Sequence, residues 1–291
     1  MTYELKNDFL ALQVSSRGAE ITSMYASDGR QIIWHGDSRY WERHAPLLFP
    51  CVGGNWEGII RVDGTQYPLC KHGFVQDMEF SLIQSTAESL SLAVTDTPET
   101  LKSFPFPFRL IVTYTLCGSR LDVAWTVENP AEREMPFLIG AHPAFLLPAF
   151  NPADAVHGYL RFPEVDTLVS TPTLPRGYTH PEQTELFPLT DHLLPLTNET
   201  FRCDTILDIR GRISQVELLD ASRRPLLSVQ FRMPVLAMWA PEDGCSPFVC
   251  IEPWCGLCDS EGYTGEFNQR PYINKVRARE NWQCLYSICV E

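Results

Sequence analysis

The sequence predicts an all-β protein in which many short antiparallel strands form a sandwich or a barrel. Apolar and polar residues alternate with a period of two along several segments, as expected of strands with one buried face. Turn signals, such as Ser-Asp-Gly at 27–29 and Glu-Asn-Pro at 128–130, recur at short intervals. No window combines sustained helical periodicity with a cap at each end, so no long helix is expected.

The clearest predicted element is a hairpin. Apolar residues alternate from 108 to 116 and again from 121 to 127, and Cys-Gly-Ser-Arg at 117–120 supplies the turn between them. Short helical turns are expected near 38–42 and 98–103. The same alternation predicts further strands at 10–14, 90–94 and 227–231.

The segment from about 150 to 200 interrupts this pattern. It is rich in Pro, Thr and His and poor in alternation, so we expect long loops or an insertion over one face. Clear strands resume after it without a change in composition, and no internal repeat is evident. The sequence therefore predicts one domain over residues 1–291, with a loop-rich segment at about 150–200.

The composition excludes several classes of protein. Of the 291 residues, 44% are apolar and 20% are charged, which is typical of a folded chain. The 36 acidic residues outnumber the 23 basic ones, and the resulting net charge of −13 would repel a nucleic-acid backbone. The most apolar stretch, 135–150, contains His142 and three prolines and is not a membrane span.

The start of the chain and its cysteines indicate the cellular environment. Residues 1–7 contain no basic segment leading into an apolar one, so no signal peptide is recognised. Without such a signal, the ten cysteines are expected to be reduced and mostly buried thiols. We therefore expect a cytoplasmic protein.

Three polar residues in apolar or unusual local surroundings are candidates for chemistry: His72, His142 and Glu252. Glu252 shares a strand face with Cys250 and Trp254, so it is expected to face an apolar, aromatic-lined site. Burial in such a site raises the pKa of a carboxyl group towards neutrality, which suits a general base.

Prolines follow two of these candidates. His142 precedes Pro143 and Glu252 precedes Pro253, which favours extended backbone at both positions. Because proline cannot donate to a sheet ladder, we expect both prolines at strand ends or edges. Stiff, extended backbone would hold the two side chains in place, as acid–base catalysis requires.

The same residues can also have purely structural roles. His142 can be a hydrogen-bonded core histidine, the segment 71–73 can be a plain turn, and the tryptophans can fill a β core. Cys255 and Cys258 have the spacing of half a zinc or redox site, but no second pair with matching spacing follows. No metal site is expected.

Six segments in a fixed order carry a resemblance to a known family. They are 16–21, 41–50, 71–74, 104–108, 136–145 and 250–256. Together they resemble the aldose 1-epimerase (mutarotase) family, and within it the lactose-operon-type branch near the hexose-6-phosphate 1-epimerases. The resemblance implies a large antiparallel β-sandwich, the galactose mutarotase-like supersandwich.

The resemblance also implies an activity. His142 matches the general acid of the family and Glu252 matches the general base. Glu252 would take the proton from the C1 hydroxyl of a cyclic hexose while His142 gives one to the ring oxygen. The ring opens, C1 rotates and closure yields the other anomer. This isomerase needs no cofactor, and the sequence contains neither a Gly-rich phosphate loop nor a Ser nucleophile elbow.

Other positions are implied to bind the sugar, which is the only partner expected. His72 is expected to help hold it, and Arg43, next to His44, is expected to contact it. Asp204 matches an aspartate that binds a sugar hydroxyl, and Trp254 is expected to line the site.

One position departs from the family pattern. The family segment usually reads His-Gly-Phe-Ala-Arg, and the hexose-phosphate epimerases use its arginine in binding phosphate. Gln76 stands at that position and supplies no charge to a phosphate. A free hexose is therefore favoured, although Arg43 keeps a hexose-6-phosphate 1-epimerase as an alternative.

Three other functions are alternatives to the epimerase. His72, His142 and Glu252 are the ligand types of a non-haem iron centre. A carbohydrate-binding β-sandwich without turnover would have the same fold, although it needs no acid–base pair. A glycosidase would use Asp204 and Glu252 as its two carboxyl groups.

Overall fold

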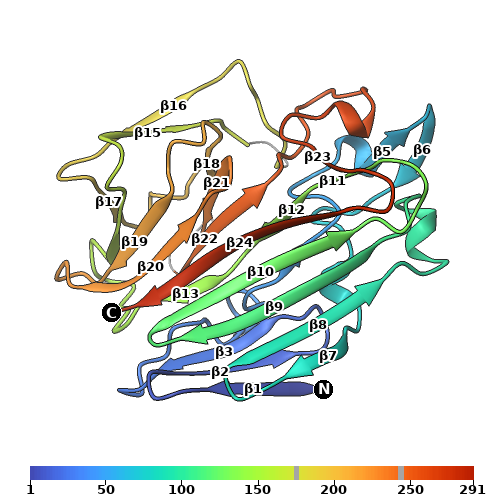
Figure 1. Ribbon diagram of the computed structural model, residues 1–291. Coiled ribbons are helices and arrows are strands. Elements are labelled where there is room, and N and C mark those ends of the chain that lie inside the picture. Colours follow the sequence, from blue (N-terminus) through green and yellow to red (C-terminus); the bar gives the residue numbers. More distant parts are fainter. Residues whose placement is uncertain (174–176, 242–245) are drawn as a thin grey trace.

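The computed structural model of the chain describes residues 1–173, 177–241 and 246–291. Within these ranges the secondary structure consists of strands and four 3₁₀ turns, without an α-helix (Figure 1). The all-β prediction is therefore confirmed. The 3₁₀ turns are η1 (Trp56–Gly58), η2 (Val75–Asp77), η3 (Thr100–Lys102) and η4 (Phe267–Gln269).

The largest sheet has nine strands, and all neighbouring strands in it are antiparallel. It crosses the molecule diagonally in Figure 1, with β24, the red strand, near its middle. In spatial order its strands are β17 (Leu193–Leu196), β14 (Gly158–Arg161), β19 (Gln215–Leu219), β20 (Pro225–Phe231), β24 (Asn281–Val290), β10 (Arg120–Glu128), β9 (Arg109–Cys117), β8 (Ser89–Thr95) and β7 (Ser81–Ser85).

A six-stranded sheet lies behind the first in Figure 1. Its strands are β18 (Ile206–Asp208), β21 (Val235–Trp239), β22 (Phe248–Cys255), β12 (Ile139–Ala141), β4 (Leu47–Leu48) and β13 (Ala144–Leu146). β22 is central, because β21 pairs with one edge while β13 and β12 pair with successive parts of the other.

Smaller sheets complete the described part of the chain. One has three antiparallel strands: β1 (Thr2–Lys6), β2 (Leu10–Ser15) and β3 (Ile21–Ala26). The two-stranded sheets are β5 (Ile59–Val62) with β6 (Thr65–Pro68), β11 (Met135–Phe137) with β23 (Asn274–Val276), and β15 (Thr167–Ser170) with β16 (Glu185–Pro188).

One hydrophobic core joins the two large sheets. Val112 and Trp125 of the nine-stranded sheet belong to the same cluster of buried side chains as Ile139 and Ile251 of the six-stranded sheet. Burying an apolar side chain of this size stabilises the fold by about 1.5–3 kcal/mol. Both sheets have separate edge strands, so the architecture is a sandwich and not a closed barrel.

The predicted hairpin is formed by β9 and β10. Cys117 is opposite Arg120, and every second residue of each strand is buried, from Leu110 and Leu121 onward. Gly118 has φ +60°, a conformation that favours glycine in a tight two-residue turn. The strands expected at 10–14, 90–94 and 227–231 are confirmed as β2, β8 and β20.

The structure adds detail to the local predictions. Between its loops, the segment 150–200 contains the short strands β14 to β17, of which β14 and β17 extend the nine-stranded sheet. Their alternation is too short to recognise in a segment rich in Pro and Thr. Near 38–42 the backbone N–H groups of Tyr40 and Trp41 both donate to the carbonyl oxygen of Asp37 over 3.0 Å, so the expected helical turn is present as one short turn. The 3₁₀ turn η3 confirms the one expected near 98–103.

Pro253 departs from expectation, because it lies inside the central strand β22 and not at a strand end. It is opposite Leu236 of β21. On its other edge, β22 pairs with β13 up to Cys250 and with β12 from Trp254 onward. Pro253 therefore lies where the ladder on that edge is interrupted, which is how a central strand accommodates it.

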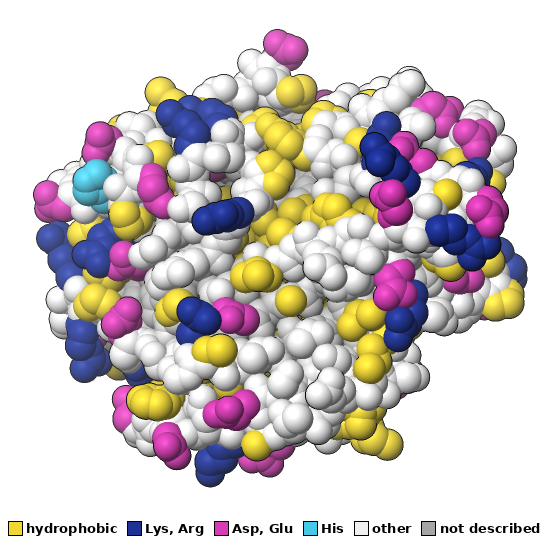
Figure 2. Space-filling view, in the orientation of Figure 1, with side chains coloured by type: hydrophobic (Ala, Val, Ile, Leu, Met, Phe, Trp, Pro, Cys, Tyr) yellow, Lys and Arg dark blue, Asp and Glu magenta, His cyan; other side chains and the backbone are white. Residues whose placement is uncertain are grey.

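The visible surface matches the composition, whereas only four of the nine described cysteines are buried, fewer than expected. On the face seen in Figure 2, Lys and Arg side chains are interspersed with Asp and Glu, and no continuous basic patch covers that face. None of the helices in the described ranges has the length and hydrophobicity needed to cross a lipid bilayer. The nine described cysteines are all free thiols, and Cys245 lies outside the described residues.

Candidate active site

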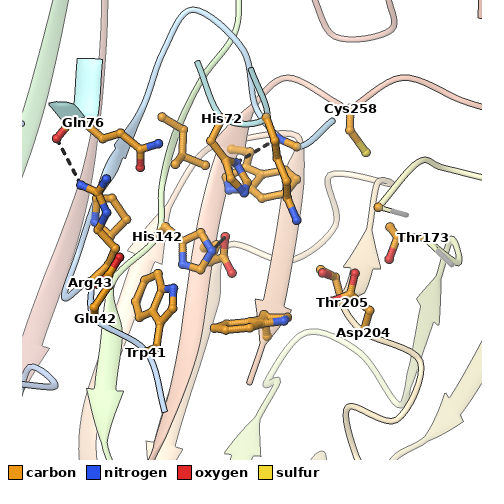
Figure 3. Close-up of a pocket in the computed structure, with 18 residues that line it drawn as sticks. Trp41, Glu42, Arg43, His72, Gln76, His142, Thr173, Asp204, Thr205 and Cys258 are labelled. Atoms are coloured by element: carbon orange, nitrogen blue, oxygen red, sulfur yellow. Dashed lines mark hydrogen bonds and ion pairs between the residues drawn. The ribbon is translucent and has the colours of Figure 1, made fainter. Parts of the chain in front are cut away.

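A cavity of about 440 Å³ opens beside the central strand β22. Its walls come from segments far apart in the sequence, which the sandwich brings together (Figure 3). The cavity is lined by all seven residues that the sequence predicted for the site: Arg43, His72, Gln76, His142, Asp204, Glu252 and Trp254.

Glu252 lies on β22, in which every residue is buried. Its side chain is only 1% exposed, and its Oε2 atom has no hydrogen-bond partner. Burial raises the pKa of this carboxyl group well above its ordinary value, because a buried charge loses its hydration. Among the described groups, Lys71 opposes this shift and Asp204 adds to it.

His142 follows β12 and faces Glu252. Its Nε2 atom lies 3.4 Å from Glu252 Oε2, and its ring stacks on Trp41 with a centroid distance of 4.9 Å. Figure 3 shows the two rings side by side in the cavity. Burial lowers the pKa of His142 to about 3, and the positive charge of Lys71 adds to this effect. The surroundings therefore favour neutral forms of both members of the pair.

His72 is held at the cavity wall by its backbone and by one ring nitrogen. Its φ is +66°, and Gly73 after it has φ +75°. A Cβ atom on Gly73 would lie 2.1 Å from the carbonyl oxygen of Phe49, so only glycine fits there. The N–H of Gly53 donates to Nδ1 of His72 over 3.1 Å. The proton of neutral His72 is therefore on Nε2, which is a hydrogen-bond donor.

A buried ion pair supports the loop that contains Gly53. Arg270 and Asp259, whose side chains are each 2% exposed, lie 2.6 Å apart. Arg270 also donates to Oδ1 of Asn55 over 2.8 Å, and Asp259 accepts from the backbone N–H of Trp56 over 2.8 Å. Asn55 and Trp56 follow Gly53 in the chain, so the pair anchors the segment that orients His72.

Arg43 reaches the opposite side of the cavity but is already paired. It donates to Asp77 over 2.8 Å and to the backbone oxygen of Gln76 over 3.3 Å, and Glu20 lies 3.9 Å away. In Figure 3, Arg43 and Gln76 lie on one side of His142, and Asp204 lies on the other. The positive charge of Arg43 is thus largely balanced by carboxylates.

Several lining residues were missed at the sequence level. Trp41 and Trp239 contact the His142 ring, and Lys71, Thr173 and Cys258 also line the cavity. Lys71 forms no ion pair with any described carboxylate. Lys71 could have been recognised from its neighbour His72, and Trp41 from its place in segment 41–50 beside Arg43. No local pattern marks Trp239, Thr173 or Cys258 as a cavity residue.

The structure also shows which residues have metal-binding geometry. One ligand atom each of His142, Cys250 and Glu252 lies within 4.8 Å of the other two. This set differs from the iron ligands considered from the sequence, because it contains Cys250 in place of His72. Cys255 and Cys258 have different surroundings: the thiol of Cys255 contacts Cys284, whereas Cys258 lines the cavity.

Known structures share this architecture. A galactose mutarotase related enzyme from Lactobacillus acidophilus superposes with a TM-score of 0.92 and 28% identity, covering 100% of this chain and 97% of that one. A galactose mutarotase-like protein from Lactobacillus casei ATCC 334 also has a TM-score of 0.92, with 26% identity and full coverage of both chains. The fold and cavity therefore define a galactose mutarotase-like protein.

Sequence comparison specifies the family. The family model for aldose 1-epimerase matches residues 1–264. Protein LacX, chromosomal, of Lactococcus lactis subsp. lactis is 30% identical over 303 aligned residues, which cover 100% of this chain and 99% of that protein. The chain belongs to the aldose 1-epimerase family, as the resemblance indicated.

Proposed function

We propose that this protein is an aldose 1-epimerase that interconverts the α and β anomers of a hexose. The observation that carries the proposal is the contact of 3.4 Å between His142 and Glu252, buried in a cavity large enough for a monosaccharide. Membership of the aldose 1-epimerase family supports the same reaction. A single domain over residues 1–291 and a cytoplasmic location are part of this proposal.

The chemistry follows from the two facing groups. In the reactive form of the pair, the single shared proton is on His142 and Glu252 is ionised. Glu252 takes the proton from the C1 hydroxyl, the bond between C1 and the ring oxygen breaks, and His142 protonates the ring oxygen, which leaves both groups neutral. After rotation about the bond between C1 and C2, the same groups transfer the protons in reverse while the ring closes. The exclusion of water from Glu252 strengthens each interaction in the site.

The other cavity residues position the sugar in this proposal. His72 donates from Nε2 to a sugar oxygen, because its Nδ1 atom is occupied by Gly53. Trp254 is buried beside His72, with ring centroids 6.2 Å apart, and its apolar face suits the C–H face of a sugar ring. Asp204 is assigned to a sugar hydroxyl on the side of the cavity away from Arg43.

The test is a measurement of anomer exchange. The purified protein is added to freshly dissolved α-hexoses, and the approach to anomeric equilibrium is followed by polarimetry or NMR. Acceleration above the uncatalysed rate supports the epimerase. Binding of the same sugars without acceleration would establish the non-catalytic carbohydrate-binding alternative, and release of a sugar from a glycoside would establish the glycosidase.

Free hexoses are expected to be turned over at least as well as their 6-phosphates. Gln76 is uncharged, and the guanidinium group of Arg43 is already engaged by Asp77. The measurement is kcat/KM for glucose and for glucose 6-phosphate under identical conditions. A preference for the phosphate of more than about tenfold, or ~1.4 kcal/mol, would contradict this expectation and favour the hexose-6-phosphate 1-epimerase.

Activity is expected to survive an excess of metal chelator, because the proposed proton transfers use only side chains. The measurement compares kcat before and after treatment with EDTA, followed by dialysis. Loss of activity that one divalent metal restores would contradict this and would direct attention to His142, Cys250 and Glu252, whose ligand atoms lie within 4.8 Å of one another.

The pH dependence is expected to show the raised pKa of Glu252. The reactive pair holds one proton, so kcat/KM should fall as the pH rises through this pKa, above which that proton is lost, and burial places this pKa well above the ordinary range of Glu. The groups acting on it are Lys71 and Trp254, which lower this pKa, and Asp204, which raises it. His142 and Cys250 also face Glu252.

Lys71→Met should therefore move the fall in kcat/KM to higher pH. Lys102→Met is the matched control, because Lys102 is an exposed side chain that pairs with Glu99. A fall in wild-type kcat/KM near pH 4.3, the value of an exposed Glu, would show that Glu252 does not titrate as the buried base.

A further inference from the structure

The thiols of Cys255 and Cys284 meet between the two large sheets. Cys255 is the last residue of β22 in the six-stranded sheet, and Cys284 lies on β24 in the nine-stranded sheet. The Cys255 thiol donates a hydrogen bond to the sulfur of Cys284, with the two sulfur atoms 3.8 Å apart. Among the described cysteines, no other two thiols are hydrogen-bonded to each other.

The two cysteines differ in their access to solvent. Cys255 is 5% exposed, whereas Cys284 is partly exposed and lines a groove of about 560 Å³. Gln230 and Arg232, which lie on and just after β20, line the same groove. This groove is separate from the candidate active site, with which it shares no lining residue. A small solute can therefore reach Cys284 without entering the sugar cavity.

We propose that Cys255 and Cys284 are a redox-active dithiol, which a hydroperoxide converts into a disulfide that links the two sheets. The thiolate of Cys284 attacks one peroxide oxygen, the O–O bond breaks, and hydroxide leaves. The sulfur of Cys255 then attacks the sulfenic acid on Cys284, the S–O bond breaks, and water leaves with the thiol proton. Two thiols lose two electrons in total, and hydrogen peroxide is reduced to two molecules of water.

The acidities of the two thiols support this order of attack. The hydrogen bond from Cys255 lowers the pKa of Cys284, because it stabilises the thiolate. The same hydrogen bond, together with burial, raises the pKa of Cys255. Cys284, the more accessible of the two, is thus the better nucleophile. Cys255, which is buried beside it, is in position to attack the sulfenic acid that forms on Cys284.

The geometry requires only a small movement. A disulfide needs an S–S distance of about 2.05 Å, so the sulfur atoms must approach from their present 3.8 Å. Cys258, three residues after Cys255, is the other cysteine nearby in the sequence. Its side chain packs directly on Gly53, where a Cβ atom would lie only 2.3 Å from the Cβ atom of Cys258, and it lines the sugar cavity. Cys284 is therefore the partner that the fold provides for Cys255.

The experiment treats the folded protein with hydrogen peroxide, blocks the remaining thiols with an alkylating agent, and counts them by intact mass. The wild type should lose two alkylatable thiols, regain them with dithiothreitol, and show a Tm several degrees higher in the oxidised form. Cys289→Ser, on the same strand β24, and Cys258→Ser are matched controls and should behave in the same way.

Cys255→Ser and Cys284→Ser should each abolish the reversible loss of two thiols. Cys255→Ser should instead gain oxygen on Cys284, because the resolving thiol is absent. Since Cys255 is buried and its replacement can impair folding, the partly exposed Cys284 provides the second, independent variant. Retention of every thiol by the oxidised wild type, or a reversible disulfide that persists in Cys284→Ser, would overturn the proposal. Neither readout depends on epimerase activity.

Discussion

Glu252→Gln is expected to lower kcat by about 10²–10⁴-fold, or roughly 3–5 kcal/mol, while sugar binding persists. The amide keeps the shape of the side chain but cannot accept the proton from the C1 hydroxyl. His142→Asn should have an effect of similar size, because its Nε2 atom faces Glu252 across 3.4 Å. The measurements are kcat from anomer exchange by NMR and sugar affinity by calorimetry.

The double variant distinguishes a working pair from two independent groups. Glu252→Gln with His142→Asn should be little worse than either single change, because both protons move in one step. His72→Asn is the comparison for a binding residue, and it should raise KM as well as lower kcat. A folded Glu252→Gln protein that keeps more than about a tenth of wild-type kcat, a loss under ~1.4 kcal/mol, would assign the base elsewhere, with Asp204 as the next candidate.

Arg270→Met is expected to destabilise the fold by about 3–5 kcal/mol. The variant leaves the carboxylate of Asp259 buried without its partner, because both side chains are only 2% exposed. Asn55 also loses the hydrogen bond that Arg270 donates over 2.8 Å. The measurement is the free energy of unfolding from urea titration, with ligand-free protein.

Two further variants test the cause of this loss. Arg270→Met combined with Asp259→Leu removes both charges and should recover part of the stability, because no unpaired charge remains buried. Lys102→Met breaks an exposed ion pair with Glu99 and should leave the free energy of unfolding nearly unchanged. A loss under about 1 kcal/mol for Arg270→Met would show that the buried pair is not a major contributor.

Local patterns predicted the all-β class and five strands of the structure, which are β2, β8, β9, β10 and β20. The hairpin of β9 and β10 is correct to its turn, because alternation over two long neighbouring strands and a Gly-containing turn specify the register together. The strands β14 to β17 were not predicted, since each has only four residues and alternation over four residues has little statistical weight. β14 and β17 form where they can pair with the edge of the nine-stranded sheet, which is a tertiary contact.

The candidate site was predicted through the resemblance. Glu252 and His142 stand in apolar segments before prolines, and the family pattern assigns them to one site; the structure brings them to 3.4 Å. Nothing in the segment around Arg43 indicates that Asp77 and Glu20 balance its charge, because those carboxylates come from other parts of the chain.

The sequence by itself determined the all-β class, five of the strands, the family and, through the family resemblance, the residues that converge on the cavity. Only the tertiary structure decided which charges are paired and which thiols meet. Arg270 contacts Asn55 across 215 residues, and Cys255 contacts Cys284 from the opposite sheet. Strand alternation is a property of neighbouring residues, whereas ion pairs, pKa values and thiol contacts depend on distances that exist only after the two sheets have packed.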